Sequence, residues 1–155
     1  MTVAHLLTPG AEISPALRER ISGDAVIAFL EASTDWHLSE DEELWLAGDP
    51  APDAFRTWCD AALEGRALCL KEPVLQRLSL VAGIHKAIAA FLPEPALQAR
   101  WLRSCNLMTG PRPPIACIGD ASLEDLAAFQ ANLVERFSRF PLKSVAIVEA
   151  SLPAG

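Results

Sequence analysis

The sequence lacks the cysteine and histidine spacings that hold metal ions. It contains four cysteines and three histidines in 155 residues, but no two cysteines form a Cys-x-x-Cys pair and the histidines are scattered. Structural zinc sites need such closely spaced ligands. We therefore expect no metal site, and we expect the cysteines to be reduced thiols of a cytosolic protein.

Catalytic groupings are missing as well. The chain has no local Ser/His/Asp or Cys/His arrangement, no glycine-rich loop of the kind that holds phosphate, and no paired carboxylates beyond the run Glu40–Glu43. That run needs no chemical role, because the helix dipole favours acidic residues in a first turn. We expect that the protein is not an enzyme, with no catalytic residues and no cofactor.

Signal-peptide and membrane-spanning patterns are also absent. Met1–Pro9 has neither a basic start nor a long apolar core, and no apolar run approaches the roughly 20 residues that cross a bilayer. A chain that is 51% hydrophobic can still bury a sizeable core. We expect a globular, cytoplasmic protein with no membrane partner.

Basic charge is scarce in one half only. Residues 1–72 carry five basic and fourteen acidic residues, a net charge of −9, whereas residues 73–155 carry eight and six, a net charge of +2. An acidic surface repels the phosphates of nucleic acids. DNA is therefore a disfavoured partner for the amino-terminal half.

Helix start and stop signals run along the whole chain and predict an all-α fold. Residues 1–13 have mixed polarity and are expected to be a loose lead-in. Ser14 before Pro15 predicts a short helix over about 15–21, with a break at Ser22-Gly23 and a second helix over about 25–36.

Two short helices follow. Ser39 and Glu42 form a capping box that opens a helix ending at Gly48, and another helix begins at about Pro52. Short helices joined through a glycine and a tight turn are the minimum pattern of a helix-turn-helix, although any helical hairpin gives it.

The second of these helices would read DNA in such a unit. Its candidate DNA-binding residues are Arg56 and Thr57, which stand among Asp53, Asp60 and Glu64. DNA-reading helices usually present Arg, Lys, Asn or Gln. The chemistry of this helix therefore argues against tight DNA binding.

A linker over 65–72 leads to Pro73 and a long apolar helix through about Leu92, which we expect to be the spine of the fold. Within it, Gly83 is expected to mark close helix packing. His85 lies on the apolar stripe, where a histidine is more often a core residue with a polar partner than a metal ligand.

A further helix containing Trp101 leads into a turn that reads Gly-Pro-Arg-Pro-Pro. Gly110 is the residue of this turn that is free to take positive φ, and the prolines fix the backbone around Arg112. Such a turn suits the presentation of Asn106 and Arg112 to a partner, because little entropy is lost on binding. A simple helix–helix connection explains the same pattern.

The rest of the chain is predicted as a short apolar segment over 115–118, a helix that begins with the capping box Ser122-x-x-Asp125, and an extended tail over 141–155 after Pro141.

The run from Leu75 to Ile115 resembles the toxin-binding domain of the Xre/MbcA/ParS-type antitoxins. Family-like residues stand in order without a gap: Leu78, Ser79, Gly83, Ile84, Lys86, Phe91, Pro93, Trp101, Leu102, Asn106, Gly110, Arg112, Pro114 and Ile115. Residues 38–58 are similar, more loosely, to the helix-turn-helix of that family.

The resemblance implies a small helix-turn-helix-like domain with its lead-in over 1–72, a toxin-binding domain over 73–140 and the tail. It implies an antitoxin of a type II toxin–antitoxin pair, usually a homodimer, that occludes an NAD-consuming toxin with a RES domain. The implied toxin-binding residues are Trp101, Asn106, Gly110, Arg112 and Pro114. The alternative is a helix-turn-helix transcription regulator that acts on its own operon.

Overall fold

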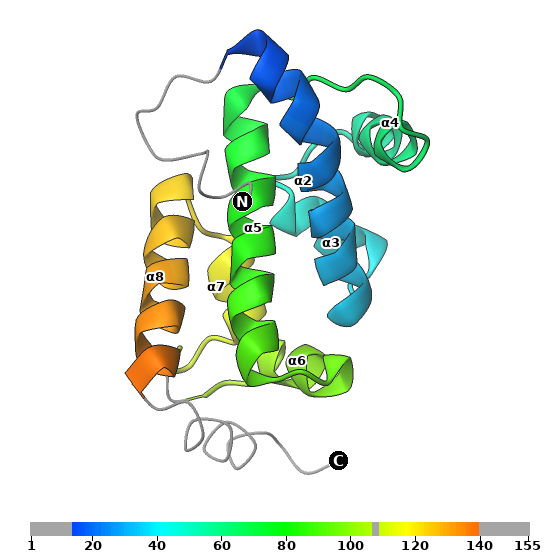
Figure 1. The fold of residues 1–155 in the computed structure, drawn as a ribbon. Coiled ribbons are helices and arrows are strands. Elements are labelled where there is room, and N and C mark those ends of the chain that lie inside the picture. The colour runs from blue at the N-terminus through cyan, green and yellow to red at the C-terminus, as the bar shows by residue number, and fades with distance from the viewer. Residues whose placement is uncertain (1–13, 107–108, 140–155) are drawn as a thin grey trace.

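A long central helix organises the molecule. In a computed structural model that describes residues 14–106 and 109–139, α5 (Glu72–Phe91) lies between α2 (Pro15–Asp35) and α8 (Leu123–Arg139), which pack along it (Figure 1). The described residues form seven α-helices and no strand. The predicted all-α class and the predicted central helix are therefore confirmed.

Four short helices surround this three-helix arrangement. They are α3 (Glu40–Leu46), α4 (Pro52–Leu63), α6 (Pro95–Leu102) and α7 (Pro114–Gly119). Helix α4 packs on α2, whereas α7 packs on α3 and α6. Two segments about 70 residues apart in the sequence thus meet where α3 contacts α7.

The predicted break at Ser22-Gly23 is wrong, because α2 runs through it without interruption. The Ser22 hydroxyl donates to the carbonyl of Arg18 at 2.6 Å and accepts from the backbone N–H of Leu70 at 3.1 Å. Ser22, which was expected to end a helix, is thus buried and hydrogen-bonded within α2. The long-range contact to Leu70 stabilises the helix against its weak local propensity.

The short apolar segment expected over 115–118 is the helix α7. Pro113 is its N-cap residue and Pro114 occupies the first helical position, where proline is favoured. Ile115 and Ile118 of this helix face the core. The segment is too short for its sequence period to distinguish a helix from an extended run.

The predicted caps are present. The Ser39 side chain accepts from the N–H of Glu42, and the Glu42 side chain accepts from the N–H of Ser39, so the capping box is complete. Ser14 caps α2, and the Ser122 hydroxyl accepts from the N–H of Asp125. Gly48 has φ +95°, the left-handed conformation predicted at the end of α3.

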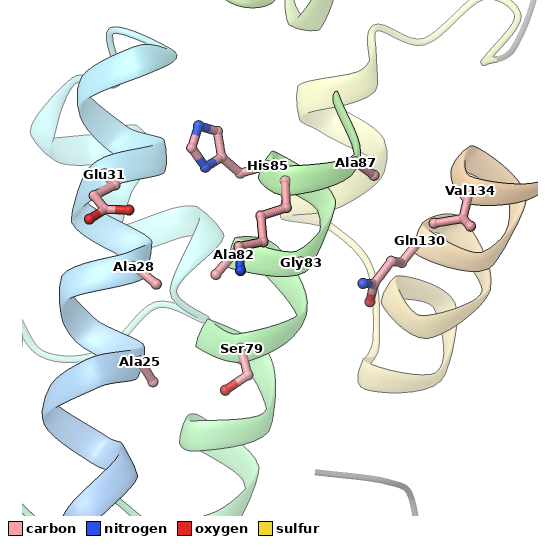
Figure 2. A pocket seen from close by; sticks show the side chains of 11 residues that line it. Ala25, Ala28, Glu31, Ser79, Ala82, Gly83, His85, Ala87, Gln130 and Val134 are labelled. Atoms are coloured by element: carbon pink, nitrogen blue, oxygen red, sulfur yellow. The ribbon is translucent and has the colours of Figure 1, made fainter. Parts of the chain in front are cut away.

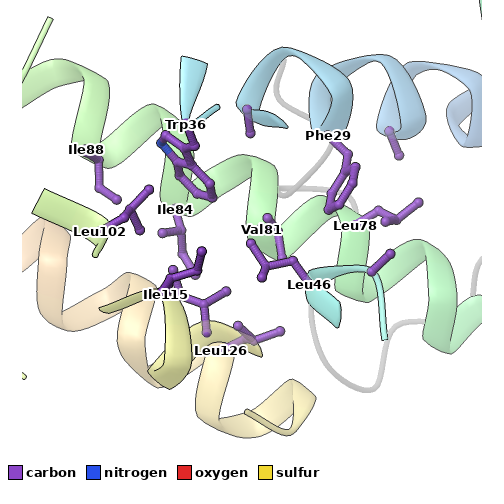
Figure 3. Close-up of a cluster of buried hydrophobic side chains, with 14 of the residues drawn as sticks. Phe29, Trp36, Leu46, Leu78, Val81, Ile84, Ile88, Leu102, Ile115 and Leu126 are labelled. Carbon is purple, nitrogen blue, oxygen red and sulfur yellow. The ribbon is translucent and has the colours of Figure 1, made fainter. Parts of the chain in front are cut away.

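One hydrophobic cluster includes side chains from residues 21 to 137. Figure 3 shows Phe29, Leu46 and Leu126, from three different helices, gathered around α5. Residues from both predicted domains therefore share this core, and the boundary at residue 72 stays a prediction. The predicted tail over 141–155 lies outside the described residues.

The expectation that no apolar run approaches membrane-spanning length is wrong: helix α5 is long and apolar enough, by length and composition, to cross a membrane, and half of its apolar stretch is buried inside the fold. Such burial is typical of the core helix of a soluble protein. His85 on this helix lies 2.7 Å from the Asp35 carboxylate through Nε2, so it is a core histidine with a polar partner, as predicted.

Candidate functional site

The turn that connects α6 to α7 contains the predicted binding residues. The carbonyl of Asn106 accepts from the N–H of Gly110 at 2.9 Å, and Gly110 has φ +68°, which confirms its predicted positive φ. The Asn106 amide donates to the carbonyl of Ser104 at 3.3 Å. A Cβ at Gly110 would meet nothing within 4 Å, so this part of the turn borders open space.

Arg112 is exposed but not unpaired. Its side chain is 53% exposed, and its guanidinium donates to Oδ2 of Asp120 at 2.5 Å. Asp120 follows α7 as its C-cap residue, so the pair spans that short helix from one end to the other. Surface ion pairs contribute little stability, and the main effect of this one is to orient the guanidinium.

Trp45 of α3 holds Asp120 from the other side. Its indole Nε1 donates to Oδ1 of Asp120 at 3.0 Å. The ring packs so closely on Gly119 that a Cβ there would lie 2.2 Å from the indole. The hydrogen bonds from Arg112 and Trp45 lower the pKa of Asp120 below its ordinary value. Asp120 thus joins the turn to a helix 75 residues earlier in the chain.

Arg77 of α5 fixes the two short helices that carry this arrangement. Its guanidinium donates to the carbonyl of Leu46 at 2.8 Å, at the end of α3. It also donates to three carbonyls at the end of α7, at 2.7 to 3.2 Å: Ile118, Gly119 and Ala121. Burial lowers the pKa of Arg77, against the attraction of Asp49. Carbonyl groups that a helix end leaves without partners are thereby satisfied.

Arg103 makes a second such connection, just before the turn. Its guanidinium donates to the carbonyls of Trp36 and His37, at the end of α2, and to Oε1 of Glu42 at 2.9 Å. The sequence patterns did not predict these roles of Arg77, Arg103, Trp45 and Asp120. Only Arg77 had a local signal, as a basic residue in an apolar helix.

Two of the predicted toxin-binding residues lie in the interior. Trp101 is 1% exposed and belongs to the hydrophobic cluster, and Pro114 is buried at the start of α7. Neither side chain is exposed to a partner protein in this structure. Asn106 is half-buried, so Gly110 and Arg112 are the exposed members of the predicted set.

The predicted DNA-binding residues lie on the surface of α4. Arg56 is 72% exposed and 3.7 Å from the Asp53 carboxylate, and the Thr57 hydroxyl donates to the carbonyl of Asp53. Asp60 and Glu64 are exposed on the same helix. The acidic character expected from the sequence is therefore present at the surface.

Among residues 14–106 and 109–139, no group of three or more His, Cys, Asp or Glu could hold a metal ion. All four cysteines are free. Burial, together with the charges of Glu43 and Asp60, raises the pKa of the Cys59 thiol to about 11. A protonated, half-buried thiol is a poor nucleophile.

Comparisons with protein-family models, with curated proteins and with solved structures found no match for this chain. The antitoxin resemblance therefore stays a prediction.

Proposed function

We propose that this protein is the antitoxin of a type II toxin–antitoxin pair, which binds and occludes an NAD-consuming toxin with a RES domain. The observation that carries the proposal is the exposed guanidinium of Arg112, placed on a proline-rich turn and oriented by Asp120. The resemblance over residues 75–115 names the class of partner. The family it names also leads us to propose a homodimer.

To block the cleft of a toxin, a charged side chain must be held in place, and the proline-rich turn holds Arg112 in this way. Pro111 and Pro113 flank Arg112, so its backbone has little freedom left to lose on binding. A carboxylate at the cleft of the toxin would share or replace Asp120 as the partner of the guanidinium. The buried Trp101 would act as a support for this region of the fold.

The test is co-expression with the product of the neighbouring gene. We expect the two proteins to co-purify, and we expect the partner to consume NAD alone but not in the complex. The assay compares the partner, the complex, and the complex after the antitoxin is removed by denaturation. A neighbouring protein that neither binds this chain nor consumes NAD would contradict the proposal.

A transcription regulator is the second candidate, favoured by the exposure of Arg56 and Thr57 on α4. The carboxylates of Asp53, Asp60 and Glu64 on the same helix oppose contact with phosphates. The antitoxin proposal does not need this surface to bind DNA.

A further inference from the structure

A groove of about 360 Å³ runs along α5 between α2 and α8, and its lining contains no residue of the turn that carries Arg112 (Figure 2). Its volume lies in the range of small-molecule sites. Its lining is as follows: Ala25, Ala28 and Glu31 of α2, Ser79, Ala82, Gly83, His85, Lys86 and Ala87 of α5, and Gln130 and Val134 of α8.

The middle of the groove is apolar and made of short side chains. Ala28 and Ala82 leave room there, because neither extends beyond a methyl group. Gln130 fills the space beside Gly83, where a Cβ would lie 2.4 Å from its amide nitrogen. This contact confirms the close packing expected at Gly83. The part of the groove at Ala28 and Ala82 thus offers a flat apolar ligand a surface without large side chains.

One end of the groove has a buried hydroxyl without a partner. Ser79 is 3% exposed, and no group in the described part of the chain forms a hydrogen bond with its Oγ. In Figure 2 it points toward α2, near Ala25. Burying a hydroxyl unpaired costs free energy, which a polar group on a ligand would recover.

The other end has two opposite charges. Glu31 of α2 and Lys86 of α5 are exposed at the groove, and the described residues give neither an ion pair. His85, beside them, already pairs with Asp35. Seven residues separate Ser79 from Lys86, about 10 Å of helix. The two polar ends of the groove are therefore separated by about the length of a small molecule.

We propose that this groove binds a free α-amino acid with a flat apolar side chain that ends in a hydrogen-bonding group. Its ammonium pairs with Glu31, its carboxylate pairs with Lys86, its apolar middle lies on the alanines, and its tip bonds the Ser79 hydroxyl. The inference does not depend on the antitoxin proposal, because the isolated chain suffices to test it.

L-tyrosine is the probe, and three analogues each remove one of its contacts. Tyramine lacks the carboxylate, 3-(4-hydroxyphenyl)propionate lacks the ammonium, and L-phenylalanine lacks the hydroxyl. Isothermal titration of the full chain should show tyrosine binding at least tenfold more tightly than each analogue. No heat with any of the four, or equal affinity for all, would overturn the proposal.

Matched variants assign each contact. Ser79→Ala should abolish the preference for tyrosine over phenylalanine, and Lys86→Met should abolish the preference for tyrosine over tyramine. Lys71→Met, an exposed lysine outside the groove, should change neither preference. A preference for tyrosine over phenylalanine that survives Ser79→Ala in a folded variant would overturn the assignment of Ser79, and with it the proposal.

Discussion

Two exposed arginines on predicted binding surfaces, Arg112 and Arg56, are held in different ways. Each pairs with an aspartate. Arg56 pairs with Asp53, one turn away on its own helix, at 3.7 Å. Arg112 pairs with Asp120 at 2.5 Å, and Asp120 also accepts from Trp45 of α3. Only the second pair is tied to a distant part of the fold.

Exposure alone therefore does not mark a binding site. Arg56 is the more exposed of the two arginines. Its side chain is 72% exposed, and that of its partner Asp53 is 96% exposed. Such a pair exchanges with water and is worth little. Arg112 stands just before α7 and pairs with Asp120, which stands just after it. A binding partner therefore meets a guanidinium that is already oriented.

Reversing the charge at Arg112 is expected to have the largest effect. Arg112→Glu should weaken the toxin complex by about 2 kcal/mol or more, because it places an acid where the partner is proposed to offer one. Binding is measured by titration of the purified partners. Arg56→Glu is the matched control and should leave the affinity unchanged. Equal effects of the two variants would remove Arg112 from the proposed site.

Adding a methyl group at Gly119 should break the contact with Trp45. A Cβ there would lie 2.2 Å from the indole, so Gly119→Ala should lower the free energy of unfolding by about 1 to 2 kcal/mol. Gly23→Ala in α2 meets nothing within 4 Å and should stabilise the protein by about 0.5 to 1 kcal/mol. Denaturant unfolding of both variants checks the two signs, and a stabilised Gly119→Ala would contradict the close packing.

The Asp120 interactions should show a pH dependence. Because hydrogen bonds in the folded state lower the pKa of Asp120, their stabilisation is present above about pH 4 and is lost as pH falls through the folded pKa. Wild type and Asp120→Asn should therefore differ in free energy of unfolding at about pH 6, and the difference should shrink as pH falls below about 4. A difference for Asp120 that grows in acid would contradict the sign.

The smallest effect is expected at α4. The double variant Arg56→Ala, Thr57→Ala should not change how the protein affects the gel mobility of the DNA upstream of its gene, because acidic side chains surround both positions. The assay is repeated at low and high salt. A shift that is abolished by the double variant and falls steeply with salt would instead favour the transcription regulator.

Local signals were sufficient to predict most of the helices. The capping serines Ser14, Ser39 and Ser122 act within three residues, and the apolar period of α5 reports burial on several sides. The same local rules predicted the break at Ser22 wrongly. They take no account of the N–H of Leu70, which bonds the Ser22 hydroxyl from 48 residues away.

The candidate site was predictable only in part. The turn and the positive φ of Gly110 follow from glycine and proline chemistry. The contacts that orient Arg112 do not, since Trp45 and Asp120 are 75 residues apart and neither stands in a motif. Their meeting depends on how α3 and α7 pack, which is a property of the whole fold.

The position of Arg77 has a consequence for the order of folding. Helices α3 and α7 have seven and six residues, too few to persist in water by themselves. The carbonyls at the ends of both accept from this one guanidinium on α5. We therefore expect both short helices to form only once the central helix has placed Arg77. On this expectation, the surface that Arg112 presents would be among the last parts of the described fold to assemble.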